Sequence, residues 1–345
     1  MKNHSFLFFL FCGLAVSAVA VPGFVGPASS YHLVKKTVLG GDGGWDYLSC
    51  DSAARRIYIS RSTHVMVIDA DSYAVVGDIP NTPGVHGIAV VPDLNKGFTS
   101  NGRDNSVTIF DLKTLKEGDR VAVGKNPDAI MYEPASKRIF TFNGAGQDTT
   151  ALDASTGKVA GTIALGGKPE FAVADDKGHV YVNIEDKSEI VQLDPIKLAV
   201  NARWSLAPGE EPSGLAIDRK THRLFSVCSN KLMVVLNAEN GHVVTTLPIG
   251  SGTDAAAFDP ETGYAFSSNG EGTVTVVHED SPDKYSVVEN VVTQRGARTM
   301  TLDPKTHRLF SVTAEFGPTP APTAERPRPR PPMVPGTFTL LVLEK

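Results

Sequence analysis

Short hydrophobic runs separated by turn residues recur along most of the chain. Residues 212–252, PSGLAIDRKTHRLFSVCSNKLMVVLNAENGHVVTTLPIGSG, show the pattern best. Each copy holds four runs rich in Val, Ile, Thr, Phe and Tyr, and Gly, Asn, Asp and Pro separate them. This composition predicts strands and tight turns, and no run of a dozen residues has a helical period of 3.6. Four strands in a repeat of about 40 residues are typical of a β-propeller.

The spacing of the copies predicts the number of blades. The residues that open the first run of each copy follow one another at intervals of 40 to 44 positions; they are Asp46, His86, Asp128, Glu170, Ser213, Asp254 and Arg298. The last copy reaches the end of the chain without a fourth run, whereas residues 32–41, HLVKKTVLGG, form a fourth run that belongs to no copy. We therefore predict an all-β fold, a seven-bladed β-propeller of four-stranded blades, whose last blade is closed by the N-terminal strand.

The first residues have the features of a secretory signal peptide. Lys2 precedes an apolar stretch at 6–16, and Ala18-Val19-Ala20 matches a small-x-small cleavage site. The apolar stretch is too short to span a bilayer as a helix. We expect a signal peptide at 1–20, a single propeller domain at 21–345 in which 31–44 completes the last blade, and a periplasmic or extracellular protein. An uncleaved anchor is the alternative.

Charge and cysteine content narrow the classes of function. The formal net charge of −5 and the isoelectric point near 6.0 argue against a strongly basic surface for nucleic acid. Cys50 and Cys228 fall in blades that are not neighbours, so we predict that they are buried and form no disulfide. The chain contains no nucleophile elbow, zinc-protease motif or phosphate-binding loop.

The second and third runs, such as HVYVNIEDKSEIVQLD and RIFTFNGAGQDTTALDASTGKVAGTIALGG, resemble the YVTN (YncE-like) β-propeller repeats of bacteria and archaea. The resemblance extends over residues 31–345. It implies an exported seven-bladed propeller, and its members are linked variously to DNA binding, to roles at the cell surface and to unknown functions, with no catalytic motif in common. This chain departs from the repeat pattern where Ser60 replaces Asn and where the seventh copy carries an insert.

The residues that open the copies form the candidate site. The first strand of each propeller blade lines the central channel, so these residues should form a ring, and all but Ser213 are ionisable. We therefore predict a ligand site made of Asp46, His86, Asp128, Glu170, Asp254 and Arg298. Carboxylates and imidazole suit a divalent cation, although none is required. Arg298 could clamp an anionic group, and His86 could act as a base if a carboxylate orients it. The alternative is that these side chains face channel water or pair with one another.

The insert at 317–336, GPTPAPTAERPRPRPPMVPG, interrupts the seventh copy between its second and third runs. Proline removes donors from a strand ladder, so we expect an extended, solvated loop. Arg326, Arg328 and Arg330 alternate with proline and could dock an acidic partner. The alternative is an exposed insert without a partner.

Together these features favour an exported β-propeller that acts as a binding or scaffold protein of the cell envelope, with a small ligand or a protein partner at the channel mouth. A metal-assisted lyase or hydrolase with His86 as base is one alternative. A DNA-binding protein, which some relatives imply, is the other, although the acidic balance weighs against it.

Overall fold

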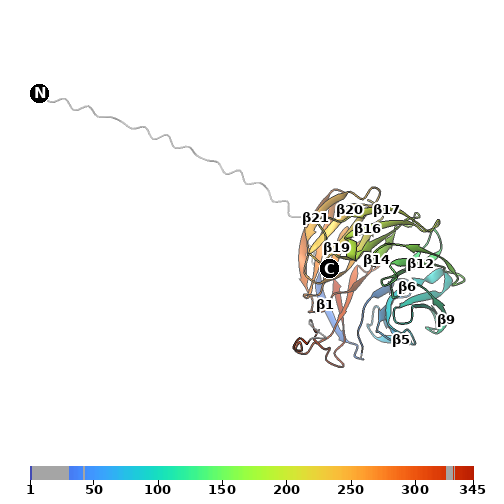
Figure 1. Ribbon diagram of the computed structural model, residues 1–345. Coiled ribbons are helices and arrows are strands. Elements are labelled where there is room, and N and C mark those ends of the chain that lie inside the picture. The colour runs from blue at the N-terminus through green and yellow to red at the C-terminus, as the bar shows by residue number, and fades with distance from the viewer. Residues whose placement is uncertain (2–30, 42, 324–328, 330) are drawn as a thin grey trace.

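The computed structural model describes residues 1, 31–41, 43–323, 329 and 331–345, and these form seven four-stranded antiparallel sheets (Figure 1). The predicted seven-bladed propeller is confirmed. Within the described residues, helical structure is limited to two 3-10 turns, η1 (Pro92–Leu94) and η2 (Glu185–Lys187). No described helix has the length and apolar character needed to cross a membrane. The predicted signal peptide at 1–20 lies outside the described residues.

The blades follow one another in sequence, and each runs from its inner to its outer strand. Blade 1 is β2 (Leu48–Asp51), β3 (Arg56–Ser60), β4 (Val65–Asp69) and β5 (Val75–Ile79). Blade 2 is β6 (Val85–Val91), β7 (Lys96–Asn101), β8 (Ser106–Asp111) and β9 (Glu117–Ala122). Blade 3 is β10 (Pro127–Glu133), β11 (Arg138–Asn143), β12 (Asp148–Asp153) and β13 (Val159–Ala164). Blade 4 is β14 (Pro169–Ala174), β15 (Val180–Ile184), β16 (Glu189–Asp194) and β17 (Ala199–Ser205).

The remaining blades keep the same order. Blade 5 is β18 (Pro212–Asp218), β19 (Arg223–Cys228), β20 (Leu232–Asn237) and β21 (Val243–Pro248). Blade 6 is β22 (Thr253–Asp259), β23 (Tyr264–Asn269), β24 (Thr273–Ser281) and β25 (Lys284–Val292). Blade 7 is β26 (Met300–Asp303), β27 (Arg308–Thr313), β28 (Thr339–Glu344) and β1 (His32–Val38).

The two ends of the chain close the ring inside blade 7. Strand β1 pairs antiparallel with β28, from His32 opposite Glu344 to Val38 opposite Thr339, and Val34 lies at a bulge in this ladder. The inner strands of adjacent blades contact one another around the ring, including β26 with β2. Closure leaves no blade with an unpartnered side, because each one packs between two neighbours.

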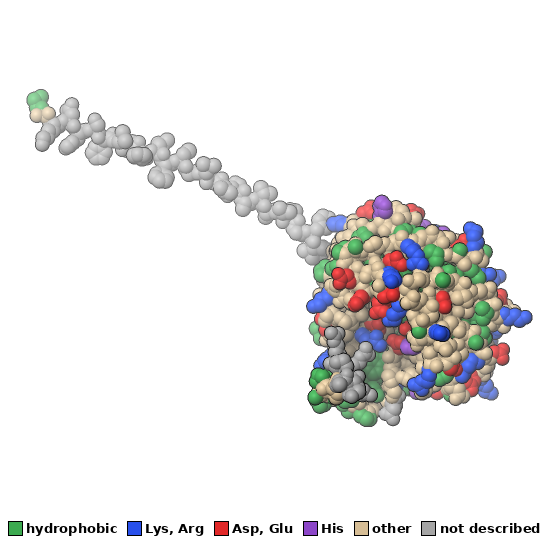
Figure 2. Space-filling model, viewed as in Figure 1, with side chains coloured by type: hydrophobic (Ala, Val, Ile, Leu, Met, Phe, Trp, Pro, Cys, Tyr) green, Lys and Arg blue, Asp and Glu red, His purple; other side chains and the backbone are tan. Residues whose placement is uncertain are grey.

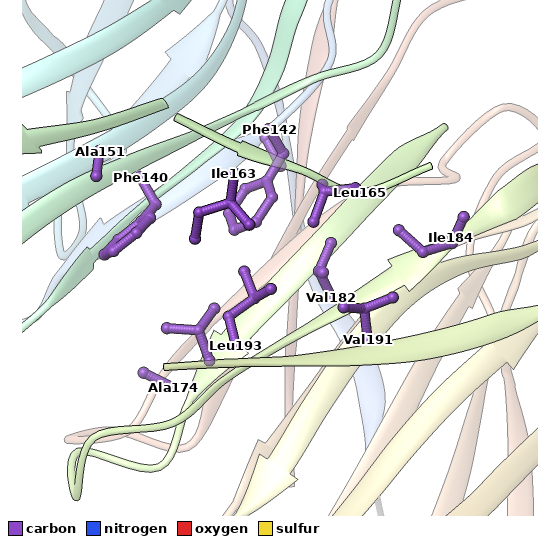
Figure 3. Packing of buried hydrophobic residues seen from close by; sticks show 12 residues of the cluster. Phe140, Phe142, Ala151, Ile163, Leu165, Ala174, Val182, Ile184, Val191 and Leu193 are labelled. Atoms are coloured by element: carbon purple, nitrogen blue, oxygen red, sulfur yellow. The ribbon is translucent and has the colours of Figure 1, made fainter. Parts of the chain in front are cut away.

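Hydrophobic side chains fill the spaces between neighbouring blades. The cluster between blades 3 and 4 contains Phe140 and Phe142 from β11 together with Val182 from β15 and Leu193 from β16, all fully buried (Figure 3). Most residues of the second and third strands are buried, for example in β11 and β12, because neighbouring blades cover both faces of each sheet there. Cys228 is buried as predicted, whereas the prediction of a buried Cys50 is wrong because this residue is half-buried on the inner strand β2; within the described residues both are free.

Buried asparagines at the ends of the second strands explain the repeat pattern. In blade 3, Asn143 Nδ2 donates to Asp148 Oδ1 at 2.6 Å and to Thr150 Oγ1 at 3.0 Å. Its Oδ1 accepts from Thr141 Oγ1 at 3.1 Å. Asn101 and Asn269 make equivalent bonds in blades 2 and 6. A buried amide bonded in this way ties the second strand to the third.

The insert differs from the expected extended loop at its base. Phe316 pairs with Met333 in an antiparallel bridge. Gly317 N donates to Pro332 O at 2.8 Å, and Val334 N donates to Glu315 O at 2.8 Å. The expectation of a wholly extended, solvated segment is therefore wrong at this end, because the donors come from Gly317 and Val334 while proline supplies only an acceptor. Arg326, Arg328 and Arg330 lie outside the described residues.

Candidate functional site at the channel mouth

The ring residues stand at the start of the inner strands, and serine hydroxyls fix the backbone there. Asp46 N donates to Ser60 Oγ at 3.1 Å in blade 1. Ser100 Oγ donates to the carbonyl of Asp128 in the next blade. Ser213 Oγ donates to the carbonyl of Asp254 at 2.8 Å, also across a blade boundary. The first bond fixes the start of an inner strand within its blade and the other two join neighbouring blades, so the side chains of the ring meet at one end of the channel.

Most of the ring residues are linked to one another in a continuous series. Asp254 accepts from Arg298 Nη1 at 2.7 Å, and Arg298 Nη2 donates to Asp46 Oδ1 at 3.4 Å. Asp46 Oδ2 lies 2.6 Å from His86 Nδ1, which is itself 3.7 Å from Asp128 Oδ1. The structure thus brings together the residues predicted from the repeat, and a carboxylate orients His86. Arg298 already binds two carboxylates, which a ligand anion would have to displace.

Glu170 has a different set of partners, on the blade 4 side of the mouth. Lys168 Nζ lies 2.7 Å from Glu170 Oε1, and the same ammonium pairs with Glu185. Lys168 stands just before β14, and Glu185 comes from the 3-10 turn η2 at the end of the second strand. Blade 4 therefore contributes two carboxylates and one ammonium to the mouth.

Two aromatic rings from opposite sides of the propeller meet in the channel next to the ring residues. Tyr47 of blade 1 stacks on Phe171 of blade 4, with ring centroids 4.4 Å apart and an interplanar angle of 30°. The Tyr47 hydroxyl is buried and has no hydrogen-bond partner among the described residues. Its pKa is raised well above its usual value by burial and by the nearby Asp128 and Glu170 carboxylates. The hydroxyl therefore stays neutral and remains an unpaired donor in the wall of the site.

A cavity of about 310 Å³ opens at this mouth, and we call it the acidic cavity. Figure 2 shows acidic and basic side chains intermixed near the middle of the visible face. Six carboxylates and two basic groups line the cavity; they are Asp46, Asp128, Glu170, Glu185, Glu211 and Asp254 with Lys168 and Arg298. Negative charge is therefore in excess, which favours a cationic ligand over an anionic one.

Burial and crowding of like charges disfavour the ionised carboxylates of the ring. Burial, together with the Asp46 charge, raises the pKa of Asp128 to about 6 and that of Asp254 to about 6. Burial and the Asp128 charge raise the pKa of Glu170 to about 8, against the opposing effect of Lys168. Burial lowers the pKa of His86, but the bond to Asp46 and the carboxylates around it outweigh this, so the net shift is upward. The basic groups of the mouth are thus too few to stabilise all of its carboxylates in the ionised form.

Three ring residues could hold a metal ion. One ligand atom from each of Asp46, His86 and Asp128 lies within 4.8 Å of the others. The oxygen and nitrogen donors suit a divalent cation. Asp46 Oδ2 and His86 Nδ1 are hydrogen-bonded at 2.6 Å, which is closer than two ligands on one ion usually stand. A cation would therefore have to break this bond and separate the two groups.

A second cavity, of about 440 Å³, adjoins the first at Arg298, and we call it the aromatic cavity. Gly43, Gly44, Trp45 and Gly296 line it together with three residues from the base of the insert; these are Phe316, Pro331 and Met333. The end of β27 and the start of β26 lie on the same face, so the insert stands beside the ring. The repeat pattern gives no sign of this proximity, because the insert stands outside the repeat.

The structure adds residues that the ring alignment left out. Lys168 and Glu211 stand two positions before the ring residues of blades 4 and 5, where the equivalent residue is glycine in four blades, namely Gly44, Gly84, Gly252 and Gly296. The backbone at Glu211 has a φ of 47°, in the left-handed region that favours glycine. Extending the alignment by two residues would have revealed these two charged residues. The contribution of Glu185 could be found only from the three-dimensional fold.

Comparisons with known proteins establish the fold. Chains described as "Structure of U3-55K" and "Crystal structure of RRP9 WD40 repeats" match with TM-scores of 0.71 and 0.72. Each match has 7% sequence identity and covers 92% of this chain and 99% of the other. No family model and no curated protein sequence matches the chain. The protein therefore has the fold of a seven-bladed β-propeller, like the WD40 repeats of these structures.

Proposed function

We propose that this propeller is an exported binding protein of the cell envelope whose acidic cavity takes a cationic ligand. The observation that carries the proposal is the excess of carboxylates over basic groups in a cavity of about 310 Å³. The raised pKa values of Asp128 and Asp254 support it, because a bound cation would stabilise the ionised carboxylates that burial and the Asp46 charge disfavour. The signal-peptide pattern at 1–20 and the resemblance to YVTN repeats support export and membership of that family.

Calorimetric titration of the mature protein with two organic cations, agmatine and spermidine, tests the proposal. We expect saturable binding of at least one of them. At a pH above the Glu170 pKa of about 8, binding should weaken in Glu170→Gln and Asp254→Asn but not in Asp119→Asn, an exposed acid on the outer strand β9. Absence of binding by both amines, or equal loss in the control variant, would reject the acidic cavity as a cation site.

Export has its own test, which is independent of the ligand. Cells that express the full chain should place the protein outside the cytoplasm, and sequencing of its N-terminus should begin at Val21. A protein recovered from the cytoplasm with Met1 still attached would reject this part of the proposal.

A divalent cation held by Asp46, His86 and Asp128 is the second candidate ligand, and their convergence within 4.8 Å favours it. Such an ion would also permit a metal-assisted lyase or hydrolase with these residues around it. Elemental analysis of the purified protein, followed by melting with Mg²⁺, Ca²⁺ and Zn²⁺, tests this candidate. We expect a rise in Tm with one ion in the parent protein and none in His86→Ala; the same rise in both would exclude the triplet.

A further inference from the structure

The acidic and aromatic cavities are neighbours that share one wall. Arg298 lines both of them, and its guanidinium is held toward the acidic cavity by Asp254 and Asp46. A ligand that extends past Arg298 would therefore contact both cavities at once. The carboxylates least neutralised by Arg298 stand across the mouth, on blades 3 to 5, and the aromatic cavity lies on the side of blades 7 and 1.

Contacts between aromatic rings hold the walls of the aromatic cavity in place. The rings of Trp45 and Phe316 lie 6.2 Å apart between centroids. Trp45 also packs on the buried Phe338, with centroids 5.2 Å apart. Gly296 has a φ of 85°, and a Cβ there would lie 2.6 Å from Phe316 Cε2. The insert can bring Phe316 to this place only because blade 7 has glycine at this position.

The wall of the aromatic cavity also contains an unused donor. The indole Nε1–H of Trp45 is buried and has no hydrogen-bond acceptor among the described residues. Buried polar groups in folded proteins are nearly always paired, so this N–H calls for an acceptor. A peptide carbonyl would reach this N–H only after a shift of the indole ring, because the nitrogen is closed off from solvent. The Tyr47 hydroxyl presents a second unpaired group in the wall of the acidic cavity.

We propose that the two cavities form one site for a peptide segment that presents a basic side chain next to an aromatic one. The basic side chain enters the acidic cavity toward Asp128, Glu170 and Glu211, and the aromatic side chain packs between Trp45, Phe316 and Met333. The peptide backbone crosses Arg298 and accepts from Trp45 Nε1 once the indole ring has shifted to expose it. A nucleic acid fits poorly because its phosphates would meet the carboxylates, and a simple amine would leave the aromatic cavity unfilled.

This inference rests on the proposed cation site and adds the aromatic half of the ligand. The test uses the mature full chain and three peptides, acetyl-Gly-Arg-Gly-Trp-Gly-amide and two versions in which Gln replaces Arg or Gly replaces Trp. Calorimetry should show that the complete peptide binds about tenfold or more tightly than either version, since burial of an aromatic side chain is worth at least that factor. Equal affinity of the complete and the Trp-free peptide would overturn the inference.

Variants separate the two halves of the site. Phe316→Ala should reduce the affinity for the complete peptide to that for the Trp-free peptide and leave agmatine binding unchanged. Trp45→Phe keeps an aromatic ring but removes the donor to the peptide backbone, so we expect a several-fold loss for all three peptides and none for agmatine. Full affinity in both variants would exclude the aromatic cavity. If agmatine binds and the complete peptide gains nothing, only the inference fails; if neither binds, the proposed function fails as well.

Discussion

Glu170 provides a direct test of the electrostatics of the mouth through the substitution Glu170→Gln, which removes the charge and keeps the shape. The side chain is 14% exposed, and its pKa is raised from 4.5 to about 8. Each unit of displacement corresponds to about 1.4 kcal/mol. Ionisation of Glu170 in the folded protein therefore costs on the order of 5 kcal/mol by the same conversion, part of which belongs to its repulsion with Asp128.

The sign of the effect follows from proton binding. Between about pH 4.5 and 8, folded Glu170 binds a proton more tightly than the unfolded chain does, so the free energy of unfolding falls as the pH rises through this window. Glu170→Gln lacks this titration. We expect its stability advantage over the parent to grow by up to about 1.4 kcal/mol per pH unit in that window and then to level off.

Urea denaturation of both proteins from pH 5 to 9, followed by circular dichroism, measures the difference. The exposed Asp119→Asn serves as the control and should track the parent at every pH. A difference between Glu170→Gln and the parent that does not change with pH would refute the account of a carboxyl crowded by burial and by Asp128. A difference that shrinks as the pH rises would mean that folding lowers the pKa of Glu170, and it would refute the account as well.

Three further predictions concern the fold and the ligand. Asn143→Ala leaves Thr150 and Asp148 without their buried amide donor, so urea denaturation should show a loss of about 1–3 kcal/mol, and a loss below about 0.5 kcal/mol would contradict the role of this amide. Deletion of residues 31–40 uncovers the edge of β28, and we expect aggregation in size-exclusion chromatography; a monomer that melts like the parent would contradict closure by β1. Agmatine affinity should rise about tenfold from pH 5 to pH 8 as Asp128 and Asp254, with pKa values of about 6, lose their protons, and a flat profile would argue against both as ligands.

The repeat made the architecture predictable from the sequence. A single blade is a weak pattern of short strands, but seven copies at nearly constant spacing fix the register of all of them. The same register placed Asp46, His86 and Arg298 at equivalent positions, and equivalent positions in a closed ring are neighbours in space. The missing fourth run after β28 predicted the pairing with β1 for the same reason.

Contacts across the ring could not be read from the repeat. Tyr47 and Phe171 come from blades 1 and 4, and their stacking depends on the width of the channel. The choice of Asp46 rather than Asp128 as the hydrogen-bond partner of His86 depends on side-chain rotamers. The insert was misjudged because its proline content predicts an extended chain, whereas its base uses the donors of Gly317 and Val334 to close beside Trp45.

The measurement that tests the central claim most directly compares agmatine and spermidine binding by the mature protein and by the triple variant Asp128→Asn, Glu170→Gln, Asp254→Asn. These substitutions remove three carboxylates of the acidic cavity while keeping the volume of each side chain. The account predicts saturable calorimetric binding of at least one amine by the parent protein and none by the triple variant, with both proteins folded by circular dichroism. Binding of equal strength in both proteins, or no binding of either amine by the parent, would contradict it.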